Sequence, residues 1–470
     1  MTGPISPQLA LDALWRGLQG DPAALDAVRL TGTEPALPSS FAVGTAAQAS
    51  IAAAALAARE LGVLRGGPAQ RVSVDMREAA IEFRSERYLR VDGQAPADPW
   101  DSIAGIYRSG DGSWVRLHTN FPHHRDGVLQ LLGCAYEREA VAQALLRRKA
   151  VDVEAAAADA GLCVTALRSF DEWDAHPQGR AVAALPVLSV TRLAAGDAAP
   201  RAWPPLPPGA RPLHGLRVLD LTRVIAGPVA GRTLAAHGAD VMLITGPHLP
   251  SIPTLVIDTG AGKRSAQLDL RDAAGREALK AVAREADVFL QGYRPGGLAS
   301  LGFSPEALAA LKPGIVCATL SAYGPTGPWA GRRGFDSLVQ TASGFNVAEA
   351  EAAGQPEPRA LPAQALDHAS GYLLAFGIQR ALARRAVEGG SWHVEVSLAQ
   401  TGHWLRGLGR LPQGLAAPEP AREEIRALLE ARDSAFGRLH TVRHAGLLHD
   451  TPPRWDRPPV PLGSDPAAWG

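Results

Sequence analysis

The chain has 470 residues, enough for two or three domains with cores of their own. Its 47 Lys and Arg residues balance its 47 Asp and Glu residues, so no overall charge favours nucleic acid or an anionic membrane surface. A mean hydropathy of -0.03, with 46% hydrophobic and 20% charged residues, is typical of a globular protein.

Cysteine usage and the N-terminus suggest a compartment. Cys134, Cys163 and Cys317 are far apart and form no CxxC pair, which favours a reducing environment without structural zinc. The first residues lack a basic segment followed by an apolar core, and the Ala-rich stretch 42–59 is too short and too weakly hydrophobic for a membrane span. We expect a cytoplasmic protein that binds neither membrane nor nucleic acid.

The first 95 residues predict a helical segment with one strand. The expected elements are a helix over 9–18, an Ala-rich helix over 45–62, a strand over 71–76 and helical residues to about 87.

Residues 96–200 predict a small α+β domain. Two alternating runs flank a Gly-Asp-Gly turn at 110–112, which is typical of a hairpin over 105–118. Helices are expected over 124–132, 137–147 and 152–160, and Ser169 is expected to cap another. A Pro-rich stretch at 201–212 then predicts a linker.

From 213 to 410 strands and helices alternate, which predicts a Rossmann-like parallel sheet covered by helices and so an α/β fold. Strands are expected over 217–221, 240–244, 265–270, 288–290 and 315–319, and helices over 226–237, 273–285 and 305–311. No GxGxxG follows the first strand, so neither NAD nor FAD is expected.

Asp367 precedes a predicted helix over 369–385. A helix N-terminus favours negative charge, and the small residues Ala369, Ser370 and Gly371 suggest room for a ligand. The alternative is that Asp367 merely caps the helix.

One helix–strand–helix unit occurs twice. Residues 66–75 and 389–397 are similar, and each stretch follows one helix and precedes another. This pattern indicates an old duplication.

Several short motifs occur in an order that resembles CoA-transferase family III, which includes formyl-CoA and carnitine CoA-transferases and α-methylacyl-CoA racemases. They lie at 213–228, 238–241, 262–270, 293–296, 323–328 and 334–340, followed by the Asp367 segment. Residues 105–180 resemble the smaller domain of the family, and 411–470 resemble its C-terminal return segment.

The resemblance implies an unusual domain order, because family members carry the large domain first. Here the small domain comes first, which fits a fusion of two trimmed copies, with 1–95 the remnant of the first. The first copy has Val43 and Gly44 near the position of Asp367, so one active site per chain is expected.

The resemblance also implies a chemistry. Asp367 would attack an acyl-CoA, form a mixed anhydride and then an aspartyl-CoA thioester, and pass CoA to a carboxylic acid. The CoA-binding positions would be Arg223, Ala226, Gly227, Lys263, Arg264, Tyr293 and Arg294. CoA would be part of the substrate, with no permanently bound cofactor. A homodimer of interlocked chains is implied, with a single self-closed chain as the alternative.

Two other functions stay open. A racemase needs a His/Asp pair for proton exchange, but the position of that His is Phe335, which leaves His368 as the substitute. A protein that has lost catalysis and only binds is the other alternative, favoured by Thr245-Gly246 and Ser300, which stand where relatives carry basic residues.

A cluster of histidines raises the question of a metal. His118, His123 and His124 lack carboxylates or cysteines at ligand spacing, so we predict a loop and no metal.

Overall fold

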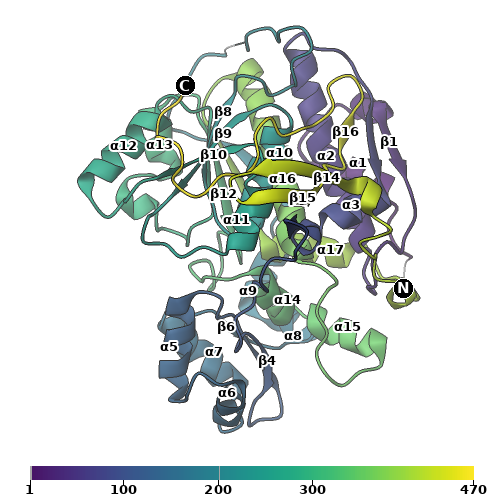
Figure 1. Ribbon diagram of the computed structural model, residues 1–470, viewed down its shortest axis with the longest axis vertical. Coiled ribbons are helices and arrows are strands. Elements are labelled where there is room, and N and C mark those ends of the chain that lie inside the picture. The colour runs from purple at the N-terminus through teal and green to yellow at the C-terminus, as the bar shows by residue number, and fades with distance from the viewer. Residues whose placement is uncertain (1–2, 201) are drawn as a thin grey trace.

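The computed structural model describes residues 3–200 and 202–470 and is built around a seven-stranded sheet (Figure 1). The strand order is β10 (Lys263–Gln267), β9 (Asp240–Thr245), β8 (Arg217–Leu221), β11 (Val288–Gln291), β12 (Val316–Ser321), β13 (Trp392–Ser397) and β7 (Leu188–Arg192). The first six strands are parallel, and β7 joins β13 antiparallel at the edge. The predicted α/β fold with a parallel sheet is confirmed.

Helices cover both faces of this sheet. Along each strand alternate residues point to opposite faces, so Val288 and Val316 join one core while Phe289 and Cys317 join another. The first face is covered by α10 (Ala226–Ala236) and α16 (Ala365–Glu388), and the second by α12 (Ala273–Ala283) and α13 (Pro305–Leu311). Strands buried on both faces explain the continuous apolar runs in the sequence.

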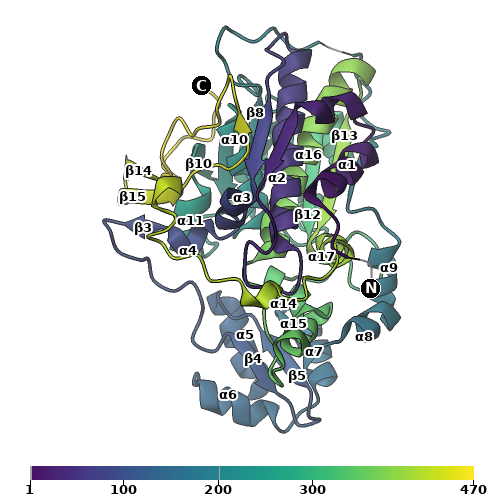
Figure 2. The ribbon, with the colours of Figure 1, turned by 90° about the vertical axis from the view of Figure 1, so that its right-hand side faces the viewer.

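The Ala-rich N-terminal helix α2 (Val43–Leu64) packs along α16 (Figure 2). It is longer than expected and, among the described helices, is the one long and apolar enough to cross a membrane. The prediction that the stretch 42–59 is too short and too weakly hydrophobic for a membrane span was therefore wrong. Because 78% of its most apolar window is buried, its apolar surface packs within the protein core.

A small domain lies at the lower end of the molecule in Figure 1. It contains the antiparallel sheet β4 (Gly105–Arg108), β5 (Trp114–Leu117) and β6 (Val164–Ala166), with helices α5 (Pro122–Leu132), α6 (Arg138–Leu145) and α7 (Ala150–Asp159) around its own core. The predicted hairpin is present, with Gly112 at φ +79° in its turn. Strand β7, which lies inside the predicted small-domain range, belongs to the large sheet instead.

The N-terminal and C-terminal segments share two small sheets. One contains β1 (Val28–Thr31), β2 (Val72–Asp75) and β16 (Leu447–Leu448); the other contains β14 (Leu429–Ser434), β15 (Gly437–Val442) and β3 (Arg90–Val91). The remaining α-helices, of four to eleven residues, are α1 (Pro7–Gly17), α3 (Met76–Glu82), α4 (Ser85–Tyr88), α8 (Phe170–Ala175), α9 (Pro177–Ala183), α11 (Pro253–Thr259), α14 (Asp336–Ala342), α15 (Phe345–Ala353) and α17 (Leu398–Gly407). Residues 1–95 are thus paired with the end of the chain. The repeated unit is present as α2–β2–α3 and α16–β13–α17.

Candidate active site

A cavity of about 350 Å³ lies between the small domain and the carboxyl ends of β8, β11 and β12. This end of a parallel sheet is where ligands usually bind in open α/β folds. Five residues predicted from the sequence line it: Arg223, Ala226, Tyr293, Arg294 and Asp367. Other lining residues include Phe121 and His124 from the small domain and Val224, Arg332, Arg333 and Phe335 from the large one.

Asp367 is the third residue of α16 and is 7% exposed. Its side chain makes no capping hydrogen bond to the helix, so it is not the cap that the alternative interpretation predicted. Burial raises the pKa of its carboxyl well above the usual value, and the nearby negative charges of Asp336 and Glu86 raise it further. The carboxyl of Asp367 therefore binds its proton more tightly than an exposed aspartic acid does.

The residue that caps α16 is Asp336, the first residue of α14, and not Asp367. Its Oδ2 atom accepts hydrogen bonds from the backbone N–H groups of Leu366 at 2.8 Å and Asp367 at 2.9 Å. Gln340 donates to the other oxygen. Burial raises the pKa of Asp336 to about 6 despite these hydrogen bonds.

The small residues Ser370 and Gly371, in the second turn of α16, serve helix packing. A Cβ on Gly371 would lie 2.5 Å from the carbonyl oxygen of Ala226 and 2.8 Å from Cβ of Val229, both on α10. Ser370 is fully buried and its Oγ lies 2.7 Å from Oγ1 of Thr401. The expectation that a ligand approaches α16 at these residues was wrong, because α10 and α17 fill the space.

Val224 marks strain at the cavity wall. It lies between β8 and α10 with φ of +74°, a conformation that is unfavourable for a β-branched residue. Such strain concentrates at functional sites.

Comparison with known proteins identifies the family. The sequence model of CoA-transferase family III matches residues 213–428. A succinate–glutarate CoA-transferase of Agrobacterium fabrum is 32% identical over 51% of this chain and 68% of its own length. The chain belongs to CoA-transferase family III.

Other relatives in this family of transferases differ in coverage. An acyl-CoA transferase of Gibberella moniliformis is 29% identical over 81% of this chain and 74% of its own length. The chain spans 58% of a probable fatty acyl-CoA transferase of Mycobacterium tuberculosis at 32% identity. A solved structure of a hypothetical protein from that organism is 33% identical, with 42% of this chain and 57% of the other covered and a TM-score of 0.39.

Three positions assigned to CoA by the resemblance to family III do not line the cavity. Lys263 is 2% exposed, and its Nζ lies 2.7 Å from Oδ2 of Asp220 and 2.8 Å from the carbonyl oxygen of Pro228. Arg264 pairs with Asp240. A Cβ on Gly227 would lie 2.4 Å from the side chain of Thr222, so this glycine permits the turn from β8 into α10.

The cavity instead gathers cations that sequence reasoning missed. Arg332 stacks on Trp329 at 4.2 Å, and Arg333 Nη1 donates to the carbonyl of Gly161 in the small domain at 3.0 Å. The signal was present, because both precede the family III motif that starts at Gly334. Together with Arg223 and Arg294 they give the cavity of this family III chain a positive lining.

Phe335 stands in the cavity wall, with the ring of His118 stacked on it at 3.8 Å. His118 lies in a loop as predicted, whereas His123 and His124 lie in the first turn of α5. Burial lowers the pKa of His118 well below its usual value and that of His124 to about 3, so both are neutral. Within the described ranges no group of three His, Cys, Asp or Glu residues is arranged to hold a metal ion.

Proposed function

We propose that this family III chain moves CoA between an acyl-CoA and a carboxylic acid, with Asp367 as the nucleophile. The observation that carries this proposal is the placement of Asp367, which is the one acidic side chain among the described residues lining a positively lined cavity. A buried carboxylate beside such a cavity suits anhydride chemistry, because water would hydrolyse the intermediate.

The reaction divides into two symmetrical halves. Ionised Asp367 attacks the thioester carbonyl, CoA thiolate leaves, and a mixed anhydride forms. The thiolate then attacks the aspartyl carbonyl, which releases the donor acid and leaves an aspartyl-CoA thioester. The acceptor carboxylate attacks the carbonyl of this thioester and expels CoA thiolate, which gives a second mixed anhydride. The thiolate then attacks the acceptor acyl carbonyl of that anhydride and displaces the carboxylate of Asp367. The new acyl-CoA leaves and Asp367 is restored, so no proton is gained or lost overall.

Two features of the cavity wall suit the anions of this reaction, which are the acceptor carboxylate and the oxyanion that forms at the carbonyl under attack. Arg223, Arg332 and Arg333 line the same cavity as Asp367, where their positive charges attract the acceptor carboxylate. Ala226, at the first position of α10, brings unpaired backbone N–H groups to the cavity wall, where they suit a developing oxyanion.

An adjoining recess offers space for the nucleotide end of CoA. It measures about 250 Å³, shares Tyr293 and Arg294 with the first cavity, and is lined by apolar side chains that include Leu268 and Leu301. We propose that the adenosine binds there, with its phosphates beside Arg294, which lines both the recess and the first cavity.

The setting of this activity is also a proposal. The three cysteines are unpaired, which suits a reducing cytoplasm. We propose that the chain works there, with no permanently bound cofactor. A homodimer stays a prediction.

The deciding experiment is mass measurement of the intact protein after incubation with acetyl-CoA or succinyl-CoA. We expect an acyl or CoA adduct on the peptide that contains Asp367 and none in Asp367→Asn. Oxalate, succinate and glutarate then serve as acceptors, because relatives are named for those acids. Absence of the adduct in the wild-type protein with every donor would leave the binding-protein alternative.

The racemase alternative has less support. Phe335 cannot transfer protons, and the His368 ring is directed at Glu86 rather than included in the cavity lining. Deuterium incorporation at the α-carbon of the acyl group, measured in heavy water, would favour the racemase.

A further inference from the structure

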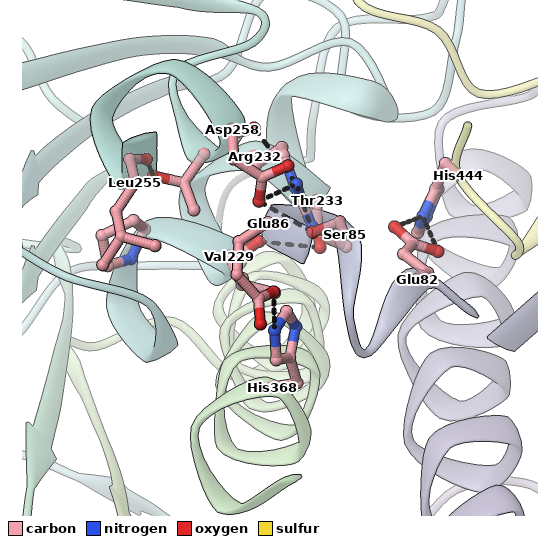
Figure 3. Close-up of polar contacts among 12 residues, drawn as sticks. Glu82, Ser85, Glu86, Val229, Arg232, Thr233, Leu255, Asp258, His368 and His444 are labelled. Atoms are coloured by element: carbon pink, nitrogen blue, oxygen red, sulfur yellow. Dashed lines mark hydrogen bonds and ion pairs between the residues drawn. The ribbon is translucent and has the colours of Figure 1, made fainter. Parts of the chain in front are cut away.

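Next to Asp367 lies a partly buried polar contact between His368 of α16 and Glu86, which the N-terminal segment contributes. Glu86, on α4, places its Oε2 atom 3.2 Å from Nε2 of His368, the residue that follows Asp367 (Figure 3). The His368 side chain is 0% exposed and that of Glu86 is 10% exposed. The His368 ring also stacks on Phe83 at 5.5 Å. The pair is therefore fixed on both sides.

Neighbouring contacts anchor this segment to the large domain. Oγ of Ser85 donates to Oδ2 of Asp258 at 2.7 Å, and Nη1 of Arg232 lies 3.0 Å from the same oxygen (Figure 3). Arg232 belongs to α10 and Asp258 to α11, so α4 is tied to α11 and to α10, which packs against α16. Glu86 is thus held at a defined place beside the first turn of α16.

We propose that Glu86 and His368 are positioning residues for Asp367. Glu86 holds the first turn of α16 through His368 and imposes a negative charge behind the nucleophile. This inference rests on the proposed function, because it assigns the pair a task in the reaction of Asp367. It also assigns a task to residues 1–95, which the resemblance treats as a remnant.

The charges around Asp367 determine the sign of the effect. Asp336 on α14 and Glu86 on α4 are negative, while Arg223 at the cavity and Arg232 on α10 are positive, with Asp258 on α11 paired to Arg232. Glu86 itself faces His368 at 3.2 Å and Arg87 at 3.7 Å. After burial and Asp336, Glu86 is the next influence that raises the pKa of Asp367. A carboxylate with a higher pKa is a stronger nucleophile once ionised, but it is ionised over a higher pH range.

The variant that tests this is Glu86→Gln, which keeps the size of the side chain and removes its charge. Glu78→Gln is the matched control, because Glu78 lies in the same segment on α3 but pairs with Arg443 at 2.7 Å. The full chain is used throughout, and thermal unfolding checks that each variant folds.

The first measurement is an infrared titration of the protonated carboxyl band of Asp367, assigned by its loss in Asp367→Asn. We expect its midpoint to move to lower pH in Glu86→Gln and to stay in place in Glu78→Gln. Glu86→Asp keeps a charge at a greater distance, so its midpoint should fall between those of wild type and Glu86→Gln. It replaces Glu86→Gln if that variant does not fold.

The second measurement is the rate of adduct formation with acetyl-CoA across pH. In Glu86→Gln we expect a higher rate at acidic pH and a lower limiting rate at alkaline pH. An unchanged titration midpoint overturns the inference even if the wild-type adduct forms. Failure of the wild-type adduct, with the midpoint shifted, overturns the proposed function instead.

Discussion

The carboxylate of Asp336 fixes the backbone of Asp367, with 2.9 Å between Oδ2 of the former and the backbone nitrogen of the latter. Asp336 thus both fixes the backbone of Asp367 and places a like charge beside its carboxyl. This arrangement satisfies the orphan N–H groups of α16 without using the side chain of Asp367, which stays available to the cavity.

Asp336 should make stability depend on pH. Its pKa is raised to about 6, above the value of about 3.9 expected in the unfolded chain. The folded state thus binds this proton more tightly, and the resulting stabilisation is complete below about pH 4 and lost as pH rises through 6. Asp336→Asn removes this dependence. We expect its Tm relative to wild type to rise between pH 4 and 7 in calorimetry, and a constant difference would contradict the raised pKa.

Asp367→Asn should abolish the covalent adduct and lower transfer on the order of 10³-fold or more, since the nucleophile is lost. The amide resembles the protonated carboxyl that burial favours, so Tm at neutral pH should equal or exceed that of wild type. Transfer assays and thermal unfolding check both statements. Activity equal to wild type would remove Asp367 from the reaction.

Gly371→Ala should separate α16 from α10. The new methyl group would overlap the carbonyl oxygen of Ala226, at a cost of about 1–3 kcal/mol in the free energy of unfolding. The control is Gly407→Ala at the end of α17, where no heavy atom lies within 4 Å of the added methyl group. Denaturant unfolding should distinguish the two, and equal stabilities would refute the close approach of the helices.

Arg294 and Lys263 should respond differently to replacement by Met. At Arg294 we expect KM for acyl-CoA to rise about tenfold with little change in Tm, as for loss of one charge-assisted contact. At Lys263 the replacement leaves Asp220 buried without its partner, which should cost about 3–5 kcal/mol in the free energy of unfolding. Steady-state kinetics and unfolding separate these effects. If Lys263→Met instead raises KM for acyl-CoA without loss of stability, Lys263 belongs to the CoA site.

Local patterns predicted most of the large domain. The helix over 305–311 is present as α13, and the strand 217–221 as β8, because each has its own periodicity and end signals. The edge strand β7 was missed, since its five residues offer only two apolar positions, Leu188 and Val190, before an exposed C-terminal end. Its partner β13 lies about 200 positions further along the chain, at the register Val190–Val394.

The sequence by itself determined the α/β class, the family and the candidate nucleophile, because these depend on residue types and spacings within short stretches. Tertiary structure alone decided that Lys263 is an interior partner, that Asp336 rather than Asp367 caps α16, and that Glu86 meets His368 across 282 positions. The physical reason is that a buried charge is defined by the partners that packing brings to it, and no local period encodes which distant helix that will be.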